Sequence, residues 1–315
     1  MLLKAFFKVC IYGFLLCFFV ACSAQKKLTE SQQINSSKTN TATAKTLHIS
    51  DNTTQEREEV TGKNDTEKYI IHLEKAASLA EKGDTISALK NYELAIQLLP
   101  QKPDAYEFAG YLLADSRMYK EAVERFQKAV DLGAANVDLF GRLGFSYARI
   151  EKYPEAVNYL SKAINLNPAN IENYAHRAFA LIETEQYERA EADYKIFLLK
   201  NPNDAISWFN ISRAQYSSGK ADASIFSLQK VLALDPDFPN ANFRLGLAYA
   251  AKQDYNNALQ AFDKAIIQTP TTGFLYFNRG IAKGKLKRND FCADFKKALE
   301  LGFTEAQQMV NTYCK

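Results

Sequence analysis

The chain has 315 residues, of which 47% are hydrophobic and 24% charged, and its formal net charge at pH 7 is +3. Loss of the two lysines of an N-terminal segment that we expect to be cleaved leaves 37 basic against 36 acidic residues, or about +1. A chain so close to neutral lacks the basic surface of a general nucleic-acid-binding protein, so we expect no nucleic-acid partner.

Residues 1–21 have the layout of a secretory signal. Two lysines precede an uninterrupted apolar run, VCIYGFLLCFFV, and Ala21 is the small residue that a signal peptidase needs. A membrane-spanning helix needs roughly 20 apolar residues, and this run is shorter. A signal is therefore favoured over the alternative of a permanent transmembrane anchor.

The next residue, Cys22, completes the motif FVAC, which resembles the lipobox of bacterial lipoproteins. Phe19 departs from that pattern, in which leucine is usual. The resemblance implies that Cys22 is acylated, with palmitate-type chains, and becomes the mature amino terminus of a lipoprotein. It also implies a bacterial membrane, with the outer membrane favoured, and a chain that faces the periplasm or the cell surface. Ordinary secretion, with Cys22 as a bystander, is the alternative.

The segment 22–68 has the composition of a disordered tether. It is rich in Ser, Thr, Asn, Gln and Lys and contains no Phe, Trp or Tyr, so it cannot bury enough apolar surface to offset the entropy lost on folding. A flexible coil of this length spans roughly 35–40 Å root mean square. We therefore expect this segment to hold the rest of the chain away from the membrane.

From residue 69 the sequence repeats with a period of 34, and seven windows run from 69–102 to 273–306. Two places carry small residues in nearly every window, which lets two helices approach closely. The eighth place holds Ala76, Gly110, Gly144, Ala178, Ser212, Gly246 and Gly280, and the twentieth holds Ala88, Ala122, Ala156, Ala190, Ser224, Ala258 and Cys292. Aromatic residues recur at the fourth and twenty-fourth places, and proline closes five windows, where it stops one helix and starts the next.

This combination resembles the tetratricopeptide repeat family across residues 69–306. The resemblance implies an all-α fold, a right-handed solenoid of about seven helix-turn-helix repeats. A polar-faced helix within 304–315 is expected to cap the stack, because terminal repeats need a polar outer face for solubility.

Two windows depart from the pattern. The fifth has Gln215 where an apolar residue is usual and serine at both small places, which predicts looser or locally adapted packing. The seventh is one residue short, so Phe295 falls one place early and Lys296 occupies the aromatic place. We expect the seventh repeat to be distorted.

The resemblance also implies a concave groove, lined by the first helix of each repeat, that holds a protein or peptide partner. The candidate groove residues are Arg142, Phe145, His176, Phe179, Phe209, Asn210, Arg213, Phe243, Arg244 and Asn278. The alternative is that some of these aromatic residues pack between neighbouring repeats. Some family members clamp a terminal carboxylate, but Ala175 and Phe179 stand where that clamp has Lys and Asn. We therefore do not expect that mode of binding.

No constellation of residues suggests catalysis or metal binding. His48, His72 and His176 lie far apart in the sequence, without carboxylate or cysteine partners at ligand spacing. An ordinary catalytic domain does not fit outside the repeats. We expect no enzyme activity, no metal and no cofactor.

Cys292 and Cys314 are the two cysteines that remain beyond Cys22, and they bracket the distorted repeat and its cap. An exported chain permits a disulfide between them, which in the loop-entropy model contributes about 3 kcal/mol. The alternative is that Cys292 is a buried free thiol in a place usually taken by alanine.

Two functions follow from these expectations. The favoured one is a membrane-anchored scaffold that recruits proteins or peptides in the bacterial envelope, for assembly, secretion or wall processing. The alternative is a non-catalytic accessory subunit of an envelope enzyme. The sequence names neither the partner nor the oligomeric state.

Overall fold

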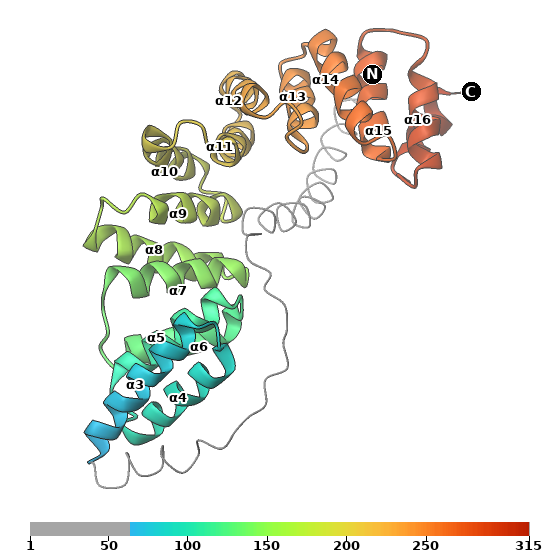
Figure 1. Ribbon diagram of the computed structural model, residues 1–315. Coiled ribbons are helices and arrows are strands. Elements are labelled where there is room, and N and C mark those ends of the chain that lie inside the picture. Colours follow the sequence, from blue (N-terminus) through green and yellow to red (C-terminus); the bar gives the residue numbers. More distant parts are fainter. Residues whose placement is uncertain (1–63, 315) are drawn as a thin grey trace. The chain divides into compact units, whose positions relative to one another are not determined.

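The computed structural model describes residues 64–314, and every regular element in that range is an α-helix (Figure 1). The expected signal, Cys22 and nearly all of the expected tether lie outside the described residues. The helices are α3 (Asp65–Glu81), α4 (Thr85–Leu98), α5 (Pro103–Asp115), α6 (Tyr119–Asp131), α7 (Val137–Arg149), α8 (Tyr153–Leu166), α9 (Glu172–Glu183), α10 (Tyr187–Lys200), α11 (Ala205–Ser217), α12 (Ala221–Leu234), α13 (Ala241–Ala251), α14 (Tyr255–Gln268), α15 (Gly273–Lys285), α16 (Phe291–Glu300) and α17 (Ala306–Tyr313). The predicted all-α fold is confirmed.

The helices form seven consecutive pairs followed by α17, and they divide into two compact units. The described part of one unit is residues 64–218, with α3 to α11, and that of the other is residues 219–314, with α12 to α17. The division falls within the fifth repeat, between its two helices. Each unit is treated separately below.

The first helix begins earlier than the sequence indicated. We expected the tether to reach residue 68, but α3 starts at Asp65. The side chain of Asn64 accepts a hydrogen bond from the Glu67 amide (3.0 Å), and the Glu67 carboxylate accepts one from the Asn64 amide (3.1 Å). This capping box satisfies two backbone amides that a helix terminus leaves open, so the helix extends to it.

The turn inside each helix pair recurs at the same place in all seven repeats. The residue at the fifteenth place has a left-handed backbone, with φ between 56° and 79°: Gly83, Arg117, Glu151, Glu185, Gly219, Gln253 and Lys287. After α3, the amide of Gly83 donates to the Ala80 carbonyl and that of Asp84 to the Leu79 carbonyl, both at 2.9 Å. This pattern of two bonds around a left-handed residue ends a helix and turns the chain.

The small eighth place lets the second helix pack directly on the first. A Cβ on Gly110 would lie 2.5 Å from a ring carbon of Phe126, and a Cβ on Gly246 would lie equally close to Phe262. Both phenylalanines occupy the twenty-fourth place and are buried. The close approach predicted from the small residues is therefore confirmed, and the aromatic ring fills the space that a side chain would need.

The seventh repeat restores this contact despite its missing residue. Lys287 still occupies the fifteenth place, so the residue is lost after the turn. A Cβ on Gly280 would lie 2.8 Å from Phe295, which is buried, whereas Lys296 is exposed. Phe295 thus takes the aromatic role that the uninterrupted period gave to Lys296, and the packing is less distorted than we expected.

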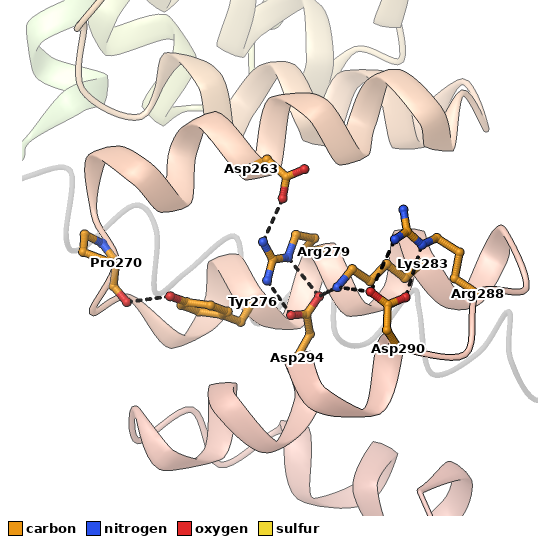
Figure 2. Close-up of polar contacts among 8 residues, drawn as sticks. All are labelled: Asp263, Pro270, Tyr276, Arg279, Lys283, Arg288, Asp290 and Asp294. Carbon is orange, nitrogen blue, oxygen red and sulfur yellow. Dashed lines mark hydrogen bonds and ion pairs between the residues drawn. The ribbon is translucent and has the colours of Figure 1, made fainter.

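Ion pairs around the buried Asp294 connect the helices of the last repeats (Figure 2). The Arg279 guanidinium on α15 donates to both carboxylate oxygens of Asp294 on α16 (2.9 and 2.6 Å) and to Asp263 on α14 (2.8 Å). Lys283 contacts Asp294 at 3.0 Å and Asp290 at 2.9 Å. Tyr276 donates to the Pro270 carbonyl at 2.9 Å, which joins the start of the repeat to the end of the preceding one.

The same arrangement recurs in the other unit. Arg177 donates to both carboxylate oxygens of Asp193 (2.7 and 2.9 Å) and to the Ser161 hydroxyl (3.1 Å). Arg177 and Arg279 both stand at the seventh place of their windows. The bidentate geometry fixes one helix against the next more specifically than a single contact can.

The C-terminal helix α17 closes the second unit as a cap. Ala306 and Met309 are buried on its inner side, in a cluster with Phe277, Phe295 and Phe303. The structure joins the sulfur atoms of Cys292 and Cys314 by a disulfide, with a Cα–Cα distance of 5.5 Å. The start of α16 and the end of α17 are thereby linked covalently.

Candidate functional site

The candidate groove residues separate into an accessible and a buried set. Arg142 is exposed, and Phe145, His176, Phe179 and Asn210 are half-buried. The remaining five are buried: Phe209, Arg213, Phe243, Arg244 and Asn278. Only the first set keeps surface that a partner can touch.

Phe209 and Phe243 stand at the fifth place of their windows, and their burial corrects our expectation that they line the groove. That place lies three residues, or nearly one helical turn, before the small eighth place, so both share the face that packs on other helices. Phe243 contacts Phe262 and Phe274, with ring centroids 6.1 and 4.9 Å apart. Phe209 and Phe243 are thus packing residues, as the alternative interpretation held.

Two of the buried polar residues are also engaged within the fold. Arg213 contacts Glu183 at 2.9 Å, and its guanidinium lies 3.4 Å from the Asn210 side-chain oxygen. The Asn278 amide donates to the Phe274 carbonyl of its own helix at 2.7 Å. Arg142, His176, Asn210, Arg244 and Asn278, the candidates at the sixth place of their windows, therefore do not all present accessible side chains.

The accessible residues touch one another from repeat to repeat. The Arg142 guanidinium lies 6.0 Å from the centre of the Tyr111 ring and pairs with Asp115 of the preceding repeat. One repeat further on, the Phe145 and His176 rings lie 4.7 Å apart. In both contacts, the sixth place of one repeat meets the ninth place of the repeat before it.

Tyrosines at the start of the second helices complete this surface, and sequence reasoning missed them. Tyr119 meets Phe145 edge to face at 5.9 Å, and Tyr153 meets Phe179 in the same way at 6.1 Å. Both tyrosines stand at the seventeenth place, which also holds Tyr187 in the next repeat and Tyr255 two repeats after that, and this recurrence was the available signal. We call Tyr119, Phe145, Tyr153, His176 and Phe179 the aromatic ladder; it lies within one unit.

Cations accompany the ladder, and one of them influences its histidine. The Arg149 guanidinium lies 5.3 Å from the centre of the Tyr119 ring. Burial, and secondly the positive charge of Arg142, lower the pKa of His176 to about 4. The imidazole is therefore neutral at pH 7 and presents an apolar, stacking surface with one donor and one acceptor nitrogen.

Polar side chains at one end of the ladder are held in a bonded set. The Tyr111 hydroxyl donates to Glu107 at 2.6 Å, and the Asn136 amide donates to the same carboxylate oxygen at 2.8 Å. Burial and the bonded Glu107 carboxylate raise the pKa of Tyr111, so its hydroxyl stays protonated. The arrangement can offer hydrogen bonds and ring faces to an extended chain.

Residues 64–314 show neither a metal-binding cluster nor a membrane-spanning helix. In this range no group of three or more His, Cys, Asp and Glu side chains is arranged to hold a metal ion. None of the helices described is both long and apolar enough to cross a membrane.

Comparisons with known proteins agree with the repeat architecture. A family model described as TPR repeat matches residues 212–253, and models described as tetratricopeptide repeat match residues 137–170, 177–231 and 239–272. No curated protein matches the chain.

Several solved structures share the fold. YrrB, described as a TPR protein with an unusual peptide-binding site, is 25% identical with a TM-score of 0.54, over 64% of this chain and 98% of YrrB. A tetratricopeptide repeat protein from Parabacteroides merdae is 19% identical with a TM-score of 0.52, over 78% of this chain and 98% of its own. MamA from Desulfovibrio magneticus, from residue 41 to its end, is 19% identical with a TM-score of 0.50, over 54% and 96%.

The 34-residue helix pairs, the recurrent left-handed turn and these matches lead to one conclusion. The chain belongs to the tetratricopeptide repeat proteins, a family of scaffolds that bind peptide or protein partners.

Proposed function

We propose that this protein is a membrane-anchored scaffold lipoprotein of the bacterial envelope, and that the aromatic ladder binds an extended segment of a partner protein. The observation that carries the binding part is the unbroken series of ring contacts from Tyr119 to His176. Half-exposed aromatic rings offer large contact area at low cost in conformational entropy, which is why they dominate binding surfaces. The likeness to YrrB, whose description names a peptide-binding site, supports the same reading.

Two further observations support the envelope part. The motif FVAC ends at Cys22, directly after the apolar run of the expected signal. The disulfide between Cys292 and Cys314 suits an exported chain, because such bonds persist in oxidising compartments and are rare in the cytosol. Stable anchoring needs more than one acyl chain. Acylation of Cys22 with several chains, as in bacterial lipoproteins, would therefore keep the repeats near the membrane.

The test combines membrane fractionation with in vivo cross-linking and mass spectrometry. After a high-salt wash, which releases charge-dependent surface contacts, we expect the native protein in the membrane fraction and Cys22→Ser in the soluble fraction. We expect cross-links to extended segments of partner proteins, concentrated on α6 to α9. If Cys22→Ser remains on the membrane after the high-salt wash, the lipid anchor is refuted. If cross-links instead identify one stoichiometric enzyme that contacts other surfaces, the accessory-subunit alternative replaces the scaffold.

A ladder variant separates binding from folding. Phe145→Ala with His176→Ala removes two adjacent half-buried rings, so we expect partner cross-links to fall at least tenfold, which corresponds to about 1.4 kcal/mol. Phe226→Ala is the matched control, because this ring is exposed but lies in the other unit. Equal loss in both variants would refute the ladder as the binding surface.

A further inference from the structure

A paired motif ends the second helix of four consecutive repeats, outside the aromatic ladder. An exposed lysine is followed, three or four residues later, by an exposed leucine or isoleucine. The pairs are Lys162 with Leu166, Lys195 with Leu199, Lys230 with Leu234, and Lys264 with Ile267. Residues at this spacing lie on the same side of a helix, so each lysine has its aliphatic neighbour beside it.

The aliphatic members are unusually open to solvent. Leu199 is 81% exposed and Ile267 is 80% exposed, while Leu166 and Leu234 are 53% and 40% exposed. Single exposed apolar residues are common on protein surfaces. Their recurrence at the twenty-ninth or thirtieth place of four successive repeats, each beside a lysine, is what calls for an explanation.

Acidic side chains are sparse where the pairs lie. The last seven residues of α8, α10 and α12 contain no Asp or Glu. In the corresponding part of α14 the acidic residue is Asp263, which is bound to Arg279 at 2.8 Å. Lys195 contacts Glu191 at 2.9 Å, one turn earlier on α10. The ends of these helices therefore offer positive charge together with apolar side chains.

We infer that in each unit these helix ends form a contact surface for anionic lipid headgroups. Lysines attract the phosphates, and the adjacent aliphatic side chains enter the boundary between headgroups and acyl chains, as on interfacial amphipathic helices. Each unit carries two of the four pairs, and a fluid lipid surface requires no fixed spacing between the units. The inference deepens the proposed function and rests on it, because an acylated Cys22 would bring the repeats to the membrane.

A flotation assay with lipid vesicles tests this surface without the anchor. The chain is used without residues 1–21 and with Cys22→Ser, so neither the apolar run nor an acyl chain contributes. We expect it to float with phosphatidylethanolamine vesicles that contain about 30% phosphatidylglycerol, and not with pure phosphatidylcholine, because lysines respond to anionic surfaces. We also expect added salt to weaken the binding.

Matched variants identify the residues responsible. Replacing the four paired lysines by Gln should weaken vesicle binding by about 5-fold for each lysine removed, and replacing the four aliphatic partners by Gln should also weaken it. The control replaces Lys82, Lys90, Lys120 and Lys296 by Gln, which changes the net charge equally at exposed lysines that belong to none of the four pairs. A small loss in the control supports the inference.

Two outcomes would overturn it: no flotation of the starting chain with anionic vesicles, or an equal loss in the control and paired-lysine variants. Because the assay excludes acylation, these outcomes leave the fractionation and cross-linking results untouched. Failure of the lipid surface and failure of the proposed scaffold are therefore distinguishable.

Discussion

The disulfide at the C-terminal cap allows a quantitative prediction. Cys292 and Cys314 are 22 positions apart, and closing a loop of this size removes enough entropy from the open chain to contribute about 3.4 kcal/mol. The cap itself buries little, because Met309 and Ala306 are its two buried residues. Ordering a residue costs about 1–2 kcal/mol of backbone entropy, so an eight-residue helix with this burial depends strongly on the covalent link.

Hydrogen exchange resolved by segment measures this effect directly, since repeat proteins open locally. In the Cys292→Ser, Cys314→Ser double variant, we expect α17 amides to exchange up to about 300-fold faster, the equivalent of 3.4 kcal/mol. Amides of α9, in the other unit, should be unchanged. Dithiothreitol should reproduce the effect in the native chain and do nothing further to the variant. If the α17 amides of the variant exchange within threefold of the native rate, the reasoning is refuted and packing alone holds the cap in place.

Three further predictions concern packing, charge and pH. Gly246→Ala should destabilise its unit by about 1–3 kcal/mol in urea unfolding, because the new Cβ would lie 2.5 Å from a buried ring. Gly284→Ala should be neutral or stabilising, since its nearest neighbour would be 4.0 Å away. Asp294→Asn should cost about 3–5 kcal/mol, because this buried carboxylate is the shared partner of Arg279 and the buried Lys283, whereas Asp290→Asn, which removes an exposed carboxylate, should cost less than about 1 kcal/mol. The lowered pKa of His176 means that the unfolded state binds a proton first as pH falls. Stability should therefore be full above pH 6.5 and fall towards pH 4, and the imidazole should remain neutral at pH 5.5 by NMR.

The sequence predicted the features that recur in every repeat, because such features share one physical cause. The eighth place must be small wherever two helices cross at that point, and Gly110 and Gly246 meet their aromatic partners as the period indicated. The fifth place was harder to interpret, because an aromatic residue suits both a core and a binding surface. Because the fifth place lies one helical turn before the small place, an aromatic residue there belongs to the core, as Phe243 does.

Features that depend on two repeats could not be found by comparing windows one at a time. Arg213 was a candidate groove residue from its place in the window, but Glu183, 30 positions earlier, contacts it. The start of α3 was set by two residues of a capping box ahead of the first window. The sequence predicted correctly that the seventh window is one residue short. Only the structure shows that the deletion falls after Lys287 and leaves the packing intact.

The same geometry explains how the ladder can vary while the fold does not. The sixth and eighth places differ by two residues, about 200° around a helix, and at Arg142 and His176 the side chain at the sixth place stays accessible beside the packed face. It meets the ninth place of the preceding repeat, as His176 meets Phe145. Each accessible side chain is thus positioned by its neighbour in the adjoining repeat. If the ladder binds a partner as proposed, exchanging one residue of a contacting pair should alter recognition at both repeats without disturbing the small residues that hold the helices together.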